Sequence, residues 1–287
     1  MNIKDQINHE IVRILELTKT SKIEDSEDFN IRGELYRLAL DLAPKARDQD
    51  IEYMREWLRV SKNEIGIDIA AGTGFLTHHL AEWSQSRVYA IDPSEIQLGA
   101  LKRRCPENRV VTVHGDLSKA ATYRYCKEIV GTVDYVTSYG GIHHVTDKNG
   151  VDRQHEMFKN VSQLLKSGGR FIAGDVGAGT ALALHFEKSV KKHCLTGHDE
   201  KWLSPERLHG ELLKDTDMEF VRAEIVPIVW NFSGLNEMAL FMKALHAYNL
   251  TEAEIISDLG SILGFHIAED GCISLNWPML LFELRKK

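Results

Sequence analysis

The residues best suited to chemistry follow a buried strand predicted over residues 64–69. Asp68 stands at the end of this strand, and Gly72 and Gly74 follow it in a turn. A helical repeat of apolar residues then starts at Phe75. Glycine has no Cβ and adopts positive φ readily, so this turn lets a ligand approach the backbone. The free N–H groups at the start of the helix add donors and a partial positive charge.

The side chains around this turn favour a ligand without phosphate. A dinucleotide fingerprint needs a third glycine, and this chain has Thr77 at that position. Asp68 would repel a pyrophosphate, because like charges disfavour each other in a partly dry site. A ligand with an ammonium group suits the carboxylate better. S-adenosylmethionine carries an ammonium and a carboxylate and has no phosphate.

The chain resembles the class I S-adenosylmethionine-dependent methyltransferases. Residues 68–74 read Asp-Ile-Ala-Ala-Gly-Thr-Gly and match the first motif of this family, D-x-A/G-x-G-x-G. The chain continues with four segments that resemble, in order, the later strands and turns of the family: residues 88–92, 110–117, 133–138 and 164–172. Five landmarks in order are far more specific than two glycines, which alone are compatible with any α/β protein.

The resemblance implies that S-adenosylmethionine is the cofactor. It assigns Asp92 to the two ribose hydroxyls, through charge-assisted hydrogen bonds of about 1.5–3 kcal/mol each. It assigns Asp116 to the adenine amino group. Taken alone, Asp92 is equally a strand-end cap and Asp116 a turn residue, but their order after Asp68 favours the cofactor. The expected cofactor-binding residues are Asp68, Ala70, Gly72, Gly74, Asp92, Pro93, Asp116, Leu117 and Ser138.

In this family the acceptor usually meets the methyl group near the end of the fourth strand. Residues 138–144 read Ser-Tyr-Gly-Gly-Ile-His-His there, without the Asn-Pro-Pro-Tyr of enzymes that methylate amide or base nitrogens. This argues against DNA adenine and protein glutamine as acceptors. His143 and His144 are the best general-base candidates, because imidazole titrates near neutral pH. Adjacent residues point apart on an extended segment, so at most one is expected to face the site; the alternative is a plain turn histidine.

Two further residues are candidates for the catalytic site. Tyr139 is expected to orient the acceptor or to contact the sulfonium by cation–π attraction. Asp175 follows the predicted fifth strand. Alignment for an in-line displacement supplies on the order of 7–11 kcal/mol in favourable systems. A general base adds about 10²–10⁴-fold where the acceptor loses a proton.

For the elements that position these residues, the resemblance implies an α/β fold with a Rossmann-like, seven-stranded sheet of the class I methyltransferase type. Residues 1–60 repeat apolar side chains at helical spacing and are expected to form an N-terminal helical cap. Residues 61–287 are the expected cofactor-binding core. Its last two strands are predicted within 219–232 and 274–284, and residues 233–273 between them are expected to form an inserted helical lid.

Composition restricts the class of protein further. The 287 residues are 43% hydrophobic and carry a net charge of −7, which disfavours nucleic acid as the main partner. No apolar run is long enough for a membrane span, and the N-terminus lacks a signal pattern. The four cysteines are far apart, so neither a metal site nor a disulfide framework is expected. A cytoplasmic location is the simplest expectation.

Three functions are compatible with these features. The first is a methyltransferase acting on a small-molecule metabolite. The second keeps the fold and consumes S-adenosylmethionine itself, by an intramolecular cyclisation of the azetidine-forming type that releases methylthioadenosine. The third is an NAD-dependent oxidoreductase or a non-enzymatic binding module. The residues leave the acceptor, the atom attacked and the oligomeric state open.

Overall fold

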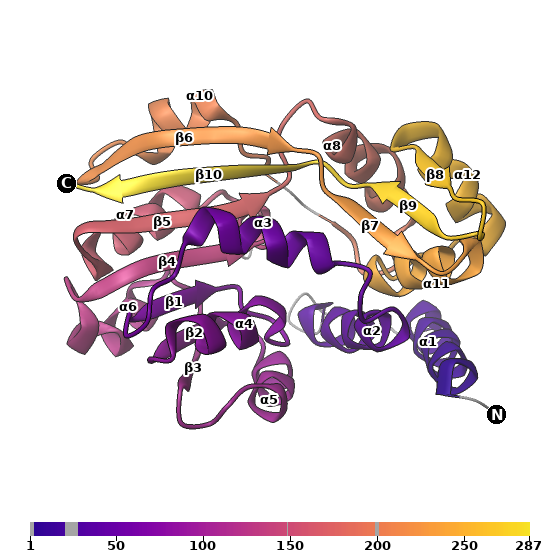
Figure 1. Cartoon of the computed structure of the whole chain (residues 1–287), viewed down its shortest axis with the longest axis horizontal. Coiled ribbons are helices and arrows are strands. Elements are labelled where there is room, and N and C mark those ends of the chain that lie inside the picture. The colour runs from indigo at the N-terminus through magenta and orange to yellow at the C-terminus, as the bar shows by residue number, and fades with distance from the viewer. Residues whose placement is uncertain (1–2, 21–27, 148, 199–200) are drawn as a thin grey trace. The chain divides into compact units, whose positions relative to one another are not determined.

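The computed structural model describes the chain except for residues 1–2, 21–27, 148 and 199–200 (Figure 1). It divides the chain into two compact units, each assembled from three segments. We call Ile51–Ala178, Glu200–Val226 and Met279–Lys287 the sheet unit. We call Met1–Asp50, Gly179–Asp199 and Pro227–Pro278 the accessory unit.

The sheet unit contains a seven-stranded sheet in the order β3-β2-β1-β4-β5-β10-β6. Its strands are β1 (Gly66–Ile69), β2 (Val88–Asp92), β3 (Val110–His114), β4 (Val133–Tyr139), β5 (Leu165–Asp175), β6 (Met218–Val226) and β10 (Met279–Lys286). Strands β1 to β5 pair in parallel, and β10 runs antiparallel to both β5 and β6. This arrangement confirms the predicted Rossmann-like, seven-stranded sheet.

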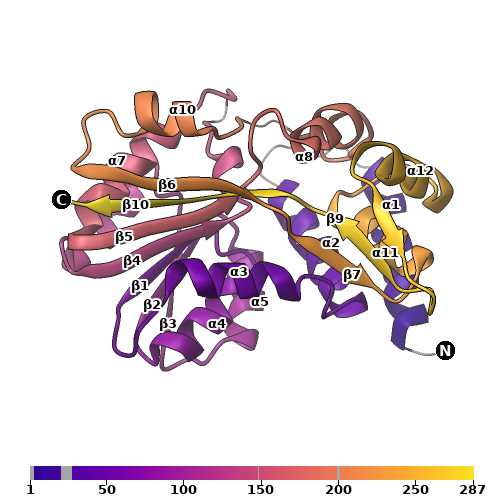
Figure 2. The same cartoon turned by 45° about the horizontal axis from the view of Figure 1, so that its top comes forward.

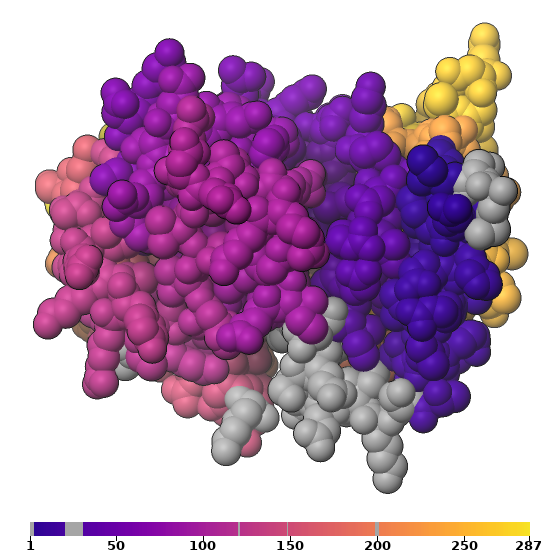
Figure 3. Space-filling model, turned by 90° about the horizontal axis from the view of Figure 1, so that it is seen from below, coloured from indigo at the N-terminus to yellow at the C-terminus, as the bar shows by residue number. Residues whose placement is uncertain are grey.

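Helices cover both faces of this sheet (Figure 2). They are α3 (Asp48–Leu58), α4 (Phe75–Ser84), α5 (Glu95–Arg104), α6 (Ala120–Tyr125), α7 (Gln154–Leu164) and α10 (Pro205–Arg207). Helices α3, α4 and α5 lie on one face, and α7 and α10 lie on the other (Figure 2). Seen from below, the purple and magenta part of the chain, which includes α4 and α5, presents a continuous surface (Figure 3). No helix in the described parts of the chain is long and apolar enough to cross a membrane.

A group of three buried phenylalanines fixes the middle of the sheet against α7. Phe158 of α7 lies 5.2 Å from Phe171 of β5 and 6.0 Å from Phe282 of β10, between ring centroids. All three side chains are fully buried. Burying a side chain of this size stabilises a fold by about 1.5–3 kcal/mol. These three rings therefore hold α7 against β5 and β10.

The accessory unit has helices around a three-stranded sheet in the order β7-β9-β8. Its elements are α1 (Ile3–Thr20), α2 (Asp28–Leu42), α8 (Ala181–His185), α9 (Lys191–His193), β7 (Val229–Phe232), α11 (Leu235–Leu245), α12 (Glu252–Ile262), β8 (Phe265–Ile267) and β9 (Ile273–Asn276). A π-helical turn, Phe186–Val190, joins α8 to α9. A capping box formed by Thr251 and Glu254 opens α12. Helices α1 and α2 belong to this unit, whereas residues 51–58 of α3 belong to the sheet unit.

The segment expected to be a helical lid, residues 233–273, is not purely helical. It contains α11 and α12, and also β8 and the first residue of β9. The two strands predicted within 219–232 and 274–284 each break in two, giving β6 with β7 and β9 with β10. Pro227 and Pro278 lie at the breaks, and proline has no N–H to continue a strand ladder. The second half of one strand, β7, and the first half of the other, β9, therefore pair with each other and join β8 in the smaller sheet.

A buried polar contact holds β7 to the start of α3. Asp50 Oδ2 accepts hydrogen bonds from Arg47 Nε and Trp230 Nε1, each at 2.8 Å. Trp230 stacks on Trp277 with ring centroids 3.9 Å apart. The Asp50 carboxylate is fully buried, and the paired guanidinium offsets the cost of burying its charge.

Candidate active site

The predicted site residues follow parallel strands that end at one edge of the large sheet. Ile69, the last residue of β1, pairs with Ile91 of β2 and with Ser138 of β4. Ser138 in turn pairs with Ala173 of β5. Because neighbouring parallel strands run the same way, the turns that follow them meet at this edge. This is the edge at which open α/β sheets bind their ligands.

The turn after β1 has the backbone conformation that its glycines predict. Gly72 and Gly74 have φ of 54° and 85°. A Cβ on Gly74 would lie 2.9 Å from Leu101 Cγ of α5, so a larger residue there would push α4 and α5 apart. Ala70 also has positive φ, at 54°, which is a strained conformation for a residue with a Cβ. Backbone strain of this kind is concentrated at ligand-binding turns.

Asp92 ties the end of β2 to this glycine turn. Its Oδ2 accepts from Gly72 N and its Oδ1 from Ser94 N, both at 2.8 Å. Burial raises the pKa of this carboxyl, and the two backbone donors and His114 oppose the shift. Asp92 therefore acts as a strand-end cap, as one of its two interpretations required. The same carboxylate lies beside the glycine turn, and its role toward the ribose hydroxyls stays a prediction.

Asp68 lies in the interior behind the glycine turn. Thr77 of α4 donates its hydroxyl to Asp68 Oδ2 at 2.6 Å. Burial raises the pKa of Asp68 to about 7, the Thr77 hydroxyl opposes the shift, and the charge of Asp92 adds to it. The residue that replaces the third glycine of a dinucleotide fingerprint is thus a partner of the motif acid. Residue type alone did not indicate this role for Thr77.

The turns after β2 and β3 are joined through their backbones. His114 Nε2 donates to the carbonyl of Pro93 at 2.9 Å. Asp116 Oδ1 accepts from the backbone N–H and the hydroxyl of Ser118, so Asp116 is a turn residue in this structure. Asn160 of α7 donates to the carbonyl of Leu117 at 2.6 Å. These contacts fix the two turns that the resemblance assigns to the ribose and the adenine.

The residues at this edge fit S-adenosylmethionine. Among the described residues, the buried hydroxyls of Thr73 and Ser138 have no hydrogen-bond partner, so both are available to a ligand. A Cβ on Gly141 would lie 2.4 Å from the Ala70 Cβ, so the turns after β1 and β4 approach each other as closely as glycine allows. The turn after β1, with its positive φ, and the Asp92 carboxylate lie at the same edge of the sheet. We call these residues the cofactor cradle, because they suit the uncharged ribose and the zwitterionic methionine part of S-adenosylmethionine.

His143 and Asp175 form a buried pair beside this cradle. His143 belongs to a short 3₁₀ helix, Ile142–His144, that follows β4, and Asp175 is the last residue of β5. His143 Nδ1 lies 2.5 Å from Asp175 Oδ1. Asp175 Oδ2 accepts from the backbone N–H groups of Ile142 and His143. Since a carboxylate only accepts, Nδ1 carries the proton and Nε2 carries the lone pair.

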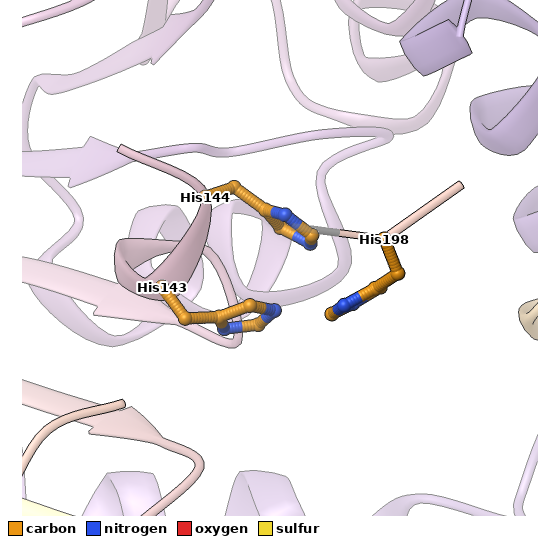
Figure 4. A group of neighbouring side chains, drawn as sticks. All are labelled: His143, His144 and His198. Atoms are coloured by element: carbon orange, nitrogen blue, oxygen red, sulfur yellow. The ribbon is translucent and has the colours of Figure 1, made fainter. Parts of the chain in front are cut away.

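His144 lies next to His143 and does not point away from it. The two ring centroids are 4.0 Å apart, and both side chains extend to the same side of the short helix (Figure 4). The expectation that the pair points apart is wrong, because the segment is helical and not extended. His198, drawn in the same view, belongs to the accessory unit. There its ring packs on the ring of Phe186, with centroids 4.9 Å apart.

Tyr139 ends β4 and packs on β5. A Cβ on Gly174 would lie 2.5 Å from the Tyr139 ring, so the ring occupies the space that this glycine leaves. Gly140 N donates to the carbonyl of Gly174 at 2.8 Å, which continues the pairing of the two strands by one residue. The ring position of Tyr139 is therefore set by the strand next to it.

Gln154 is a site residue that sequence reasoning did not find. Its side chain is fully buried, and its Nε2 donates to the carbonyls of Ile142 and Lys201 at 3.0 and 2.9 Å. Lys201 N donates to the carbonyl of His143 at 3.1 Å. Trp202 then packs on the His143 ring with centroids 5.4 Å apart. A glutamine at the start of a helix carries no signal for this role, because its partners are distant backbone carbonyls.

Comparisons with known proteins agree with this geometry. A family model described as "Methyltransferase domain" matches residues 67–169, which span β1 to the start of β5. No curated protein sequence matches the chain.

Several solved structures share the fold. A putative methyltransferase from Bacillus halodurans has 18% identity and a TM-score of 0.58 over 83% of this chain and 99% of its own. A possible histamine N-methyltransferase from Thermotoga maritima has 15% identity and a TM-score of 0.57 over 92% and 100%. Geranyl diphosphate C-methyltransferase from Streptomyces coelicolor, solved with S-adenosyl-L-homocysteine, has 13% identity and a TM-score of 0.54 over 88% and 83%.

Proposed function

We propose that this chain, which carries a class I S-adenosylmethionine-dependent methyltransferase domain, methylates a small molecule that loses a proton in the reaction. The observation that carries the proposal is the buried His143–Asp175 pair at the edge of the sheet where the cofactor cradle lies. A histidine held in one tautomer by a carboxylate is suited to accept a proton from the acceptor.

The residues of the sheet unit divide the work between binding and proton transfer. S-adenosylmethionine, when bound, supplies an activated methyl group on a sulfonium. Asp92, the turn around Gly72 and the hydroxyls of Thr73 and Ser138 would hold it. Asp116 and Leu117 lie on the turn that the family uses for the adenine.

His143 would act as the general base through Nε2. Asp175 fixes the ring through Nδ1 and stabilises the imidazolium that forms when Nε2 takes a proton. Asp175 also accepts from the backbone of Ile142 and His143, so it fixes the short helix as well as the ring. His144 and Tyr139 lie beside this pair and are proposed to contact the acceptor.

A small acceptor is favoured over a macromolecule by two observations. The net charge of −7 does not suit a nucleic acid. Two of the structural neighbours are named for small acceptors, geranyl diphosphate and histamine, which supports the same class here without naming the compound.

Product analysis tests the proposal. The full chain is incubated with S-adenosylmethionine, with and without a panel of phenols, amines and carboxylic acids, and the products are separated by chromatography. We expect S-adenosylhomocysteine, formed only when an acceptor is present. Methylthioadenosine formed without any acceptor would instead support the intramolecular cyclisation. Absence of both products, with no binding of S-adenosylmethionine, would refute both functions.

A further inference from the structure

A chain of hydrogen bonds runs through the interior of the accessory unit and ends on a histidine. Ser189 donates its hydroxyl to Asp258 Oδ2 at 2.5 Å. Tyr248 donates its hydroxyl to Ser189 Oγ at 3.2 Å. The Tyr248 oxygen lies 3.2 Å from His185 Nε2. Three of these residues, His185, Ser189 and Tyr248, are buried.

Counting protons along this chain determines the tautomer of His185. The Asp258 carboxylate only accepts, so the one hydroxyl proton of Ser189 is used on it. Ser189 must then accept from Tyr248, which uses the one proton of the phenol. The Tyr248 oxygen can therefore only accept from His185, so Nε2 carries the proton and Nδ1 carries a lone pair.

The Nδ1 lone pair of His185 is buried and, among the described residues, has no hydrogen-bond partner. Leaving such an acceptor unpaired costs about 1–3 kcal/mol, so a native protein that keeps one needs a reason for it. Burial lowers the pKa of His185 to about 4, and the charge of Asp258 opposes this shift in part. The ring is therefore neutral at physiological pH and acts as an acceptor.

Aromatic side chains pack on the ring that carries this lone pair. The rings of Phe186, His246 and Trp277 lie 5.7–6.1 Å from the His185 ring, between centroids. Phe186 and Ser189 belong to the π-helical turn Phe186–Val190. Turns of this kind are rare and occur frequently at functional sites. The chain thus interrupts a regular helix at the point where it presents an aromatic ring and the first hydroxyl of the hydrogen-bond chain.

We propose that the accessory unit binds a neutral aromatic molecule whose O–H or N–H group donates to His185 Nδ1. Phe186, His246 and Trp277 would pack on the ring of that molecule, and Tyr248 would hold His185 in the accepting tautomer. A neutral donor is favoured over an ammonium ion, because two hydroxyls separate the Asp258 carboxylate from the imidazole. Transferring a charge into such a site without a direct counter-ion is costly.

The test uses nitrogen NMR of the full chain labelled with ¹⁵N-histidine, in the absence of S-adenosylmethionine. Phenol is the probe and toluene, which has no donor, is its control. The His185 signals are identified as those lost in His185→Phe. We expect the Nε2–H tautomer in the free protein and a progressive shift of the Nδ1 resonance with phenol. Toluene should leave that resonance in place.

Matched variants complete the experiment. His185→Phe keeps a ring of similar size and should weaken phenol binding at least tenfold. His266→Phe, an exposed histidine in the same unit, should leave it unchanged. Tyr248→Phe removes only the hydroxyl and should let His185 populate both tautomers.

An Nδ1–H tautomer in the free protein would overturn the proposal, as would an Nδ1 resonance that does not respond to millimolar phenol. The second result would indicate that a buried water satisfies the lone pair. Neither result depends on cofactor binding or methyl transfer, so the proposed function would stand or fall separately.

Discussion

At the scale of single residues, two adjacent histidines differ in their surroundings. His143 is buried and paired with Asp175, whereas the His144 side chain is partly exposed. Residue type and position in the chain do not distinguish the two. The carboxylate of Asp175 makes the difference, because it fixes the tautomer and the orientation of one imidazole only.

The first prediction separates the two histidines. His143→Ala should lower kcat by about 10²–10⁴-fold, the usual contribution of a general base. His144→Ala removes a proposed acceptor contact but leaves the base in place, so it should cost less than tenfold. Steady-state kinetics with the identified acceptor measures both, and calorimetry should show unchanged affinity for S-adenosylmethionine. Full turnover by His143→Ala would leave alignment alone as the mechanism.

The second prediction follows from the raised pKa of Asp68. The folded-state pKa of about 7 lies above the usual 3.8, so the folded chain binds the proton more tightly than the unfolded chain. The stability that this proton supplies is full below about pH 4 and is lost as the pH rises towards 7. Each pH unit in that window costs about 1.4 kcal/mol, so the total is on the order of 4 kcal/mol.

Asp68→Asn removes this titration and keeps an oxygen for the Thr77 hydroxyl. Its stability relative to the wild type should therefore increase from pH 5 to pH 8, as measured by urea unfolding at each pH. Asp134→Asn serves as the control. Asp134 lies outside the glycine motif, and its carboxylate pairs with Lys166. A constant difference between Asp68→Asn and wild type across this range would show that Asp68 is ionised throughout.

At the scale of elements, the site depends on how closely two turns approach. Gly141 has φ of −130°, which any residue tolerates, so only the contact with Ala70 requires glycine there. The third prediction is that Gly141→Ala displaces the turn after β4 and weakens S-adenosylmethionine binding at least tenfold. Gly210→Ala is the control, because nothing lies within 4 Å of the Cβ that it adds. Calorimetric titration of both variants with S-adenosylmethionine provides the comparison.

The fourth prediction concerns the side chain that holds the short helix in place. Gln154→Glu cannot donate to the carbonyls of Ile142 and Lys201, and it places a carboxylate beside both oxygens. We expect the unfolding free energy to fall by about 2 kcal/mol, because the carbonyls of Ile142 and Lys201 lose this donor and meet a carboxylate oxygen in its place. Gln163→Glu lies on an exposed position of the same helix and should change stability by no more than about 0.5 kcal/mol. Equal stability of the two variants would mean that Gln154 does not hold the short helix.

At the scale of the whole molecule, the chain builds two compact units from interleaved segments. The accessory unit combines the N-terminal segment with two segments that lie between β5 and β10 in the chain, Gly179–Asp199 and Pro227–Pro278. Neither unit can be cut out as one continuous piece of chain. Ligand tests are therefore designed for the full chain.

The fifth prediction compares two ligands of the full chain. At 100 times its Kd, a ligand that binds only the folded state stabilises it by about 2.7 kcal/mol. S-adenosylmethionine should raise the Tm accordingly, and NAD at the same concentration should not. Asp92→Ala should lose most of this shift, and it should also lower the Tm of the free protein, because Gly72 N and Ser94 N lose their acceptor. A shift with NAD alone would point to the oxidoreductase that the sequence left open.

The order of the strands and the glycine turn could be predicted from the sequence by itself, because both depend on local patterns. Apolar runs that lead to Asp68, Asp92 and Asp116 indicate the strands, and glycine at positions 72 and 74 favours the positive φ of the turn. Pro227 and Pro278, which break two of the strands, are also visible in the sequence. The pairing of the strand segments after these breaks is not, because it depends on residues far apart in the chain. Only the paired backbone shows that the freed halves form a second sheet.

The tertiary structure decided the contacts between residues that are distant in the chain. It brought Asp175 to His143, Gln154 to the carbonyl of Lys201, and Tyr248 to His185. Each of these is a hydrogen bond between a side chain and a partner on another element, and no periodicity or spacing encodes it. The sequence thus determined which cofactor the chain holds, and the fold determined which histidine is placed to act as a base.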